Sequence, residues 1–177
     1  MFLKIGLTAA IVGFSLGGQT TLSGPVRPLT VCEVLSQSAA YNGKMVTLKG
    51  VDASTDEGLW VRGISCLPIT IGGREWPPVV SLVTPDMALE ETDFEFDEAS
   101  WTRVGAEYKR RLSALPRNCV EFTYTGLFQT RSNWENFKLV YPDGRILYLG
   151  YGHLNFAPAQ LIVKSADRVD SLPDCKR

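Results

Sequence analysis

The sequence predicts a mainly β domain in which five strands close a small barrel, with a short N-terminal helix, one longer helix and an added hairpin. Three observations support this fold class. Segments rich in β-branched and aromatic residues are separated by turn sequences. A single long amphipathic helix pattern falls between the third and fourth of these segments. Four cysteines, all beyond residue 18, can cross-link the domain.

The first 18 residues are typical of an export signal. Lys4 precedes an uncharged stretch over residues 5–18, and Ser15 and Gly17 are small residues at the spacing that a signal peptidase reads. The stretch is shorter than the roughly 20 apolar residues of a membrane-spanning helix. The pattern therefore favours a removed signal peptide over a permanent anchor. We expect a single domain over residues 29–177, export to the periplasm or the medium, and no membrane span after signal removal.

A short helix opens the domain. Thr30 and Glu33 have the spacing of a capping box, and Val31, Val34 and Leu35 recur at helical spacing. The helix is expected to end before the Asn-Gly pair at residues 42–43, which favours a turn.

Three strands are expected in the first half of the domain. Residues 44–51 alternate and form the first strand, residues 59–62 form the second after a turn, and residues 79–83 form the third. The intervening segment 68–78 contains Gly-Gly and Pro-Pro pairs, so we expect it to be loop.

The clearest helix covers residues 98–115. Its apolar stripe consists of Trp101, Val104, Tyr108, Leu112 and Leu115. Acidic residues precede it and the basic triplet Lys109-Arg110-Arg111 lies toward its end, which is the charge order that the helix dipole favours. Pro116 ends it.

The second half of the chain contains the remaining strands. Residues 120–130 alternate strongly and form the fourth strand. Residues 138–141 and 145–149 flank a Pro-Asp-Gly turn and form the added hairpin. A loop over residues 150–158 leads to the last strand, residues 160–164. Five strands with a helix between the third and fourth is the order of an OB-type barrel. Another small β-barrel or an α+β sandwich is the alternative.

Several segments resemble a known group. They are Val31-Cys32-Glu33-Val34-Leu35, Tyr41-Asn42-Gly43-Lys44, Val46-Thr47-Leu48-Lys49-Gly50, Leu59-Trp60 with Cys66, and Gly150-Tyr151-Gly152-His153 followed by Pro158 and Gln160-Leu161-Ile162-Val163. Together they resemble exported bacterial OB-fold-like proteins of uncharacterised function. The resemblance implies export and an OB-like barrel, and it implies no activity and no catalytic residue.

The cysteines Cys32, Cys66, Cys119 and Cys175 can pair in three ways. We favour Cys32–Cys66 and Cys119–Cys175, because each would tie an element to a nearby strand end. The alternative is that one pair stays reduced. None of the spacings is that of a CxxC or zinc site.

No metal site or cofactor is predicted. Asp93, Glu95 and Asp97 have the spacing that opens a calcium loop, but Glu98 and Val104 stand where that loop needs a glycine and a glutamate. No GxSxG motif or nuclease-type acidic motif occurs. The formal charge of −1 argues against nucleic acid as a partner.

The best candidates for ligand contacts are Trp134, Tyr148, Tyr151 and His153. The three aromatic residues belong to or flank the added hairpin, whereas Phe122, Tyr124 and Phe128 share a strand face and are assigned to the core. His153 is the only histidine, so a ligand contact or a lone general base is one interpretation. Glycines at positions 150 and 152 would let a backbone approach this loop closely. The other interpretation is a turn histidine that hydrogen-bonds locally.

The sequence therefore predicts a non-catalytic binding or structural module with no assigned catalytic residue. Its partner is an unknown protein, glycan or small ligand, bound by a loop-and-hairpin face over residues 131–158. The alternative is a small extracytoplasmic hydrolase that uses His153 with a carboxylate.

Overall fold

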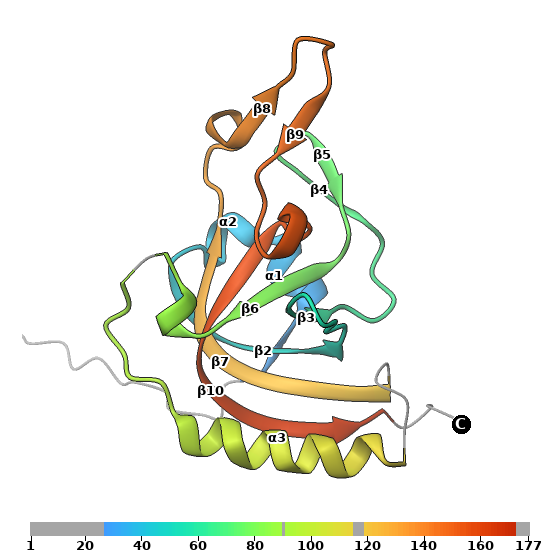
Figure 1. Ribbon diagram of the computed structural model, residues 1–177, viewed down its shortest axis with the longest axis vertical. Helices are drawn as coiled ribbons and strands as arrows, with labels where there is room; N and C mark the ends of the chain where they lie inside the picture. The colour runs from blue at the N-terminus through green and yellow to red at the C-terminus, as the bar shows by residue number, and fades with distance from the viewer. Residues whose placement is uncertain (1–26, 90, 115–118, 173–177) are drawn as a thin grey trace, which may run out of the picture.

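The computed structural model describes residues 27–89, 91–114 and 119–172 (Figure 1). The predicted signal peptide over residues 1–18 lies outside these residues. The strands are β1 Leu29–Thr30, β2 Lys44–Asp52, β3 Leu59–Arg62, β4 Ile69–Ile71, β5 Arg74–Trp76, β6 Val79–Val83, β7 Val120–Thr130, β8 Lys138–Val140, β9 Ile146–Tyr148 and β10 Ala159–Ser171. The helices are α1 Val31–Ser36, α2 Ser38–Tyr41, η1 Pro85–Met87, α3 Glu98–Leu112, η3 Trp134–Phe137 and η4 His153–Asn155.

The predicted five-stranded barrel is confirmed. Its strands pair in the order β2-β3-β6-β10-β7, and β7 pairs back onto β2 to close the barrel. The β6–β10 pair is parallel and the other four pairs are antiparallel. The short strand β1 adds to β2 outside the closed circle. Each of the five strands therefore has two neighbouring strands, which limits edge-to-edge association.

The last strand was predicted over residues 160–164, and the observed strand β10 is longer, covering Ala159–Ser171. β10 continues to Ser171 and pairs with β7 along its whole length. Register shifts fall between Val163 and Ser165 and between Ala166 and Arg168. Each bulge adds a residue and breaks the two-residue alternation that identifies a strand in a sequence.

The segment over residues 68–78, predicted as loop, instead contains the β4–β5 hairpin. Its turn is Gly72-Gly73, and both glycines have positive φ angles, 61° and 77°. Gly-Gly is a favoured pair for two-residue hairpin turns because it reaches this region without steric cost. The hairpin ends at Trp76, whose side chain is fully buried.

The barrel core is formed by the inward faces of all five strands together with α1 and α3. Phe122, Tyr124 and Phe128 on β7 are buried in it, as predicted. The predicted stripe of α3 is also confirmed, since Val104 is buried and Trp101, Tyr108 and Leu112 pack against the core. Leu115 lies outside the described residues.

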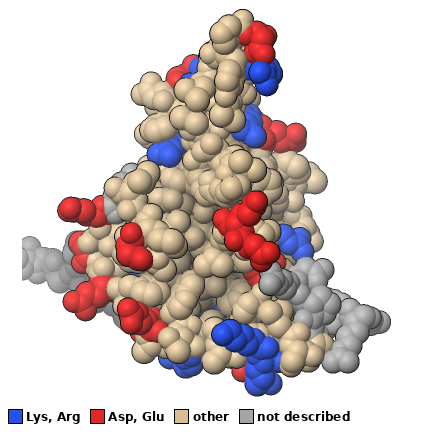
Figure 2. Space-filling model, viewed as in Figure 1, with Lys and Arg blue, Asp and Glu red and all other residues tan. Residues whose placement is uncertain are grey.

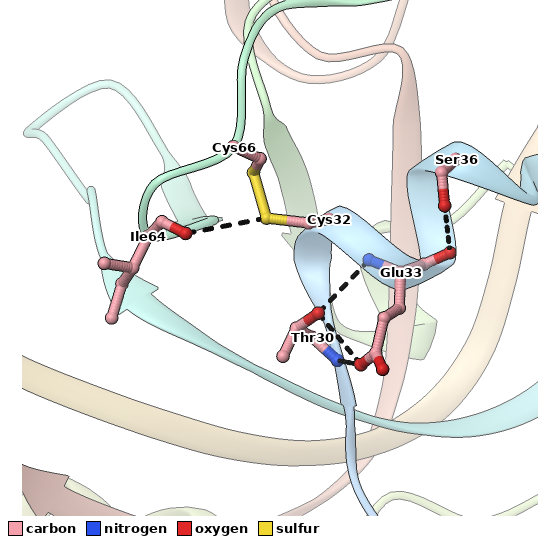
Figure 3. Close-up of a disulfide and its surroundings, with 6 residues drawn as sticks. All are labelled: Thr30, Cys32, Glu33, Ser36, Ile64 and Cys66. Carbon is pink, nitrogen blue, oxygen red and sulfur yellow. Dashed lines mark hydrogen bonds between the residues drawn. A yellow bond between two sulfur atoms is a disulfide. The ribbon is translucent and has the colours of Figure 1, made fainter.

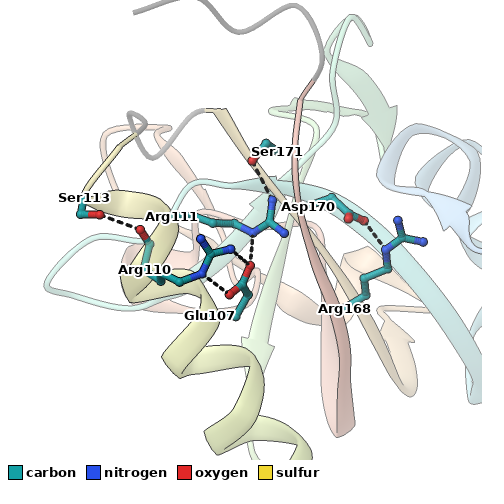
Figure 4. Close-up of polar contacts among 7 residues, drawn as sticks. All are labelled: Glu107, Arg110, Arg111, Ser113, Arg168, Asp170 and Ser171. Carbon is teal, nitrogen blue, oxygen red and sulfur yellow. Dashed lines mark hydrogen bonds and ion pairs between the residues drawn. The ribbon is translucent and has the colours of Figure 1, made fainter.

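Helix α3 lies below β7 and β10 in Figure 1 and is fixed at both ends. At its start, Asp97 caps the helix by accepting from the backbone N–H of Ser100, and the Ser100 hydroxyl accepts from the Ala166 N–H of β10 at 3.0 Å. Near its end, the Arg111 guanidinium donates to the Ser171 hydroxyl at 2.7 Å (Figure 4). These bonds hold α3 across the end of the barrel.

Glu107 organises the basic end of α3. Its carboxylate accepts from Arg110 and from Arg111, as Figure 4 shows. The Arg110 hydrogen bond, followed by the charges of both arginines, lowers the pKa of Glu107 to about 2. The basic triplet therefore lies in the last turn of α3, as predicted, and two of its members pair with Glu107 within the helix.

The predicted Cys32–Cys66 disulfide is present, with a Cα–Cα distance of 5.7 Å (Figure 3). It joins α1 to the segment after β3. The capping box of α1 lies beside it: the Thr30 hydroxyl accepts from the Glu33 N–H, and the Glu33 carboxylate accepts from the Thr30 N–H. The Thr30 and Arg27 hydrogen bonds lower the pKa of Glu33 to about 2. For the predicted Cys119–Cys175 pair, Cys119 is buried and Cys175 lies outside the described residues.

Candidate ligand-binding site

The predicted loop-and-hairpin face divides into an exposed arm and a buried base. The β8–β9 hairpin projects from the barrel at the top of Figure 1. Its exposed apolar side chains are Leu139, Val140, Tyr141 and Ile146. The predicted contact residues do not lie on this arm except for Tyr148, which is at its base and half-buried.

Trp134 is buried, with 6% of its surface exposed, and so is not the surface aromatic residue that we expected. Its ring packs 4.9 Å from that of Trp76, centroid to centroid. It also covers Gly72, where a Cβ atom would lie 2.2 Å from the indole. Tyr148 meets Trp76 edge-on, with 6.3 Å between the ring centroids. The β4–β5 hairpin therefore buries Trp134, and this hairpin lies in the segment that was expected to be loop.

Tyr151 is also buried, with 8% of its surface exposed, in a small cluster with Trp60, Val79 and Ala157 that is separate from the barrel core. The guanidinium carbon of Arg131 lies 4.3 Å from the centroid of the Tyr151 ring and 4.1 Å from that of Phe137. The two rings thus hold the guanidinium of Arg131 by cation–π contacts.

Arg131 follows the last residue of β7 and lines two adjoining cavities, of about 430 Å³ and 280 Å³. Both cavities are also lined by Asn42, Thr130 and Ser132. The larger one lies between α2, the turn of β4–β5 and the segment after β7, and Trp134 forms part of its wall. Asn42 fixes this wall by accepting the Thr130 N–H at 2.8 Å.

Two residues that line the larger cavity carry buried hydrogen-bond donors without acceptors. Arg131 Nε and Trp134 Nε1 are buried, and neither has a partner among the described residues. The one carboxylate among the described lining residues, that of Glu135, pairs with Lys138 instead. An unpaired buried donor costs about 1–3 kcal/mol, and more when it is charged. Trp60 Nε1, outside this cavity, is also unpaired among the described residues, so each such group calls for its own explanation, and a bound acceptor is one of them.

His153 lies apart from this site. Its Nε2 is 3.4 Å from Glu57 Oε2, so the carboxylate that the hydrolase alternative needs is within reach. Both side chains are exposed, by 43% and 62%, and the pair lies on the surface rather than in a cleft. Gly152 precedes His153 with a φ of 70°, and a Cβ there would lie 2.8 Å from the Ser81 hydroxyl oxygen. The glycine therefore lets this loop pack on β6.

The surface charge, the potential metal ligands and the helix lengths give no support for nucleic-acid binding, metal binding or a helical membrane span among the described residues. On the face in Figure 2, acidic and basic groups are scattered around broad uncharged areas, and the described residues there form no continuous basic groove. Over the described ranges, no group of three or more potential ligands could hold a metal ion. No helix within that part of the chain has the length and apolar character of a membrane span.

Sequence reasoning missed Arg131. It is one arginine after a strand, and nothing in its neighbours distinguishes it from the exposed arginines of the chain. The pairing of Phe137 and Tyr151 around it depends on tertiary structure.

Comparison of the chain with protein-family models, with curated proteins and with solved structures found no match.

Proposed function

We propose that this protein is an exported, non-catalytic binding module with an OB-type barrel, and that Arg131 binds the oxyanion group of a small molecule. The strand order, the parallel pair β6–β10 and the position of α3 between β6 and β7 support the OB assignment. The predicted signal over residues 1–18 and the Cys32–Cys66 disulfide support export to an oxidising compartment.

The observation that carries the proposal is the guanidinium of Arg131, held between two rings with no carboxylate partner among the described residues. A guanidinium edge presents two parallel N–H groups to a carboxylate or phosphate. Nε is one donor of such an edge, and it is buried here without an acceptor. An oxyanion bound at this edge of the guanidinium would satisfy it, and Trp134, which lines the same cavity, carries a second unpaired donor in Nε1.

The size of the cavity favours a small molecule over a protein or glycan chain. Its volume of about 430 Å³ lies within the range of roughly 300–1,000 Å³ that is usual for small-molecule sites. The indole of Trp134 offers an apolar surface next to the charged group. We therefore expect an aromatic or aliphatic carboxylate or phosphate.

The test is a titration of the protein with benzoate, phenyl phosphate and the neutral analogue benzyl alcohol, followed by ¹⁵N NMR. We expect benzoate or phenyl phosphate, but not benzyl alcohol, to shift the resonances of residues 131–135. A charged hydrogen bond contributes about 1.5–3 kcal/mol, so Arg131→Gln should weaken binding about tenfold or more. Arg145→Gln is the matched control, because Arg145 also lies over a ring, that of Tyr141, but is exposed. Equal binding by wild type and Arg131→Gln would contradict the proposal.

The second candidate is the hydrolase, supported by the His153–Glu57 pair. It predicts slow cleavage of an activated ester such as p-nitrophenyl acetate, with a rate that His153→Ala abolishes. A rate that His153→Ala leaves unchanged would remove this candidate.

A further inference from the structure

A further cavity, also of about 280 Å³ but separate from the two at Arg131, lies between α3 and the end of the barrel. Its walls come from α3, from β7 and β10, and from the turn that joins β2 to β3. The described lining residues are Asp52, Ser54, Thr55, Asp56, Leu59, Leu82, Trp101, Val104, Gly105, Tyr108, Lys109, Phe122, Tyr124 and Ala166. Most of this wall is apolar or aromatic, and it shares no residue with the Arg131 site.

The charged group inside this cavity is the carboxylate of Asp52, which is 4% exposed. Its Oδ1 accepts the Ser54 N–H at 2.9 Å, and its Oδ2 accepts the Tyr108 hydroxyl. Among the described residues, no lysine or arginine forms an ion pair with it. An ionised carboxylate has about four acceptor positions, so two remain for a further donor. A buried charge without a counterion is costly, and a cation would compensate it.

Four aromatic rings line the same cavity as the Asp52 carboxylate. The ring centroids of Tyr108 and Phe122 are 4.9 Å apart, those of Phe122 and Tyr124 are 5.3 Å apart, and those of Tyr124 and Trp101 are 5.9 Å apart. The four rings therefore form a continuous aromatic wall. The faces of such rings attract cations, and several rings together form the cages that bind ammonium groups.

The charges around the cavity also favour a cation. Asp52 and Asp56 line it with Lys109, so two carboxylates oppose one ammonium group. Asp56 and Lys109 are exposed and lie where solvent screens them, whereas Asp52 is buried. Burial, followed by the charge of Asp52 and by Tyr108, raises the pKa of Tyr124 well above its usual range. Tyr124 therefore stays neutral at physiological pH.

We propose that this cavity binds a small organic ammonium ion, with Asp52 as its counterion and Trp101, Tyr108, Phe122 and Tyr124 as its aromatic cage. An anion would be repelled by Asp52. A neutral apolar molecule would leave the carboxylate buried without compensation. A metal ion would need several ligands, and over the described residues no group of three or more His, Cys, Asp or Glu side chains could hold one. The site is independent of the Arg131 site and takes the opposite charge.

The first test uses the wild-type protein and two probes of the same shape. Benzylammonium carries the charge at neutral pH, and benzyl alcohol does not. We expect benzylammonium to shift the Trp101 indole resonance in ¹⁵N NMR and to bind at least about tenfold more tightly than benzyl alcohol. Equal affinity for the two probes, or no shift of Trp101 with benzylammonium, would overturn the proposal.

Two variants locate the binding at this cavity. Asp52→Asn keeps an oxygen acceptor and removes the charge, so benzylammonium affinity should fall about tenfold or more while that of benzyl alcohol stays the same. If Asp52 serves only to tie α3 to the barrel through Tyr108, the folded Asp52→Asn protein would bind benzylammonium as the wild type does. That result would refute the charge-based site.

The second variant blocks the space itself. A Cβ at Gly105 on α3 would meet no atom within 4 Å, so Gly105→Ala leaves the cavity open, whereas Gly105→Leu extends a side chain into it. We expect Gly105→Leu to abolish benzylammonium binding and Gly105→Ala to retain it. Unchanged binding by a folded Gly105→Leu protein would place the ligand elsewhere. Benzoate binding at Arg131 should be the same in both variants, which separates failure of this site from failure of the proposed function.

Discussion

Removal of the Cys32–Cys66 disulfide tests how much of the stability of the domain depends on a cross-link rather than on its core. The perturbation is the double substitution Cys32→Ser/Cys66→Ser. The bond closes a loop with a sequence separation of 34. In the chain-entropy model, a loop of that length restricts the unfolded chain by about 4 kcal/mol at 25 °C. We therefore expect the free energy of unfolding to fall by about 4 kcal/mol, a large fraction of the 5–15 kcal/mol usual for a domain.

The assay is equilibrium unfolding in urea, followed by tryptophan fluorescence, for the oxidised wild type and the double variant. Without the disulfide the unfolded chain is more expanded and exposes more surface. The m-value of the double variant should therefore be higher than that of the wild type. Gly63→Ala provides an independent route to the same result, since a Cβ at this position would lie 2.1 Å from Cys66 Sγ and oppose bond formation.

A loss below about 1 kcal/mol with an unchanged m-value would refute the entropic argument. It would mean that the unfolded chain already keeps residues 32 and 66 close together, as residual structure can do. The capping box of α1 is independent of the bond, because its contacts join Thr30 and Glu33 only. Helix α1 should therefore remain in the double variant.

Three further perturbations follow from individual contacts. Glu107 has a pKa of about 2, lowered from a usual value near 4.5, so it stabilises the fold above pH 4.5 and this contribution is lost as pH falls toward 2. Unfolding measured from pH 6 to pH 2 should show a shallower loss in Glu107→Gln, and an identical pH profile would contradict this assignment. Trp76→Ala should cost about 3–5 kcal/mol in urea unfolding, because the indole is fully buried and supports Trp134; a loss near that of an exposed residue would show that the β4–β5 hairpin is dispensable. Gly105→Ala should raise the free energy of unfolding by about 0.5–1 kcal/mol in the same urea assay, because alanine is the better helix former and the new methyl group meets no neighbour. A destabilised variant would mean that α3 packs more closely at Gly105 than its open surroundings suggest.

The fold was largely predictable because local patterns specify it. The alternation of residues 120–130, the stripe of α3 and the capping box at Thr30 each depend on a few neighbouring residues. The parts that were missed depend on irregular or tertiary features. Bulges in β10 interrupt its period, and the Gly72-Gly73 pair was interpreted as a loop although it forms a hairpin turn.

The candidate sites were less predictable for a related reason. Trp134 and Tyr151 were predicted as surface ligand contacts, but both are buried and contribute to cavity walls rather than to an exposed surface. The charged groups that define the sites, Arg131 and Asp52, carry no local signal. Arg131 depends on Phe137 and Tyr151, and Asp52 depends on Tyr108, which is 56 residues away in the sequence.

Strand β7 connects the two proposed sites and also keeps them apart. Phe122 and Tyr124 on β7 belong to the cavity at α3, whereas Arg131 directly follows the other end of this strand. Seven residues of extended strand separate Tyr124 from Arg131, or up to about 24 Å at roughly 3.4 Å per residue. The cavity at α3 shares no lining residue with the two cavities at Arg131. Benzoate and benzylammonium should therefore bind independently, and any coupling between them would have to pass through the packing of β7 itself.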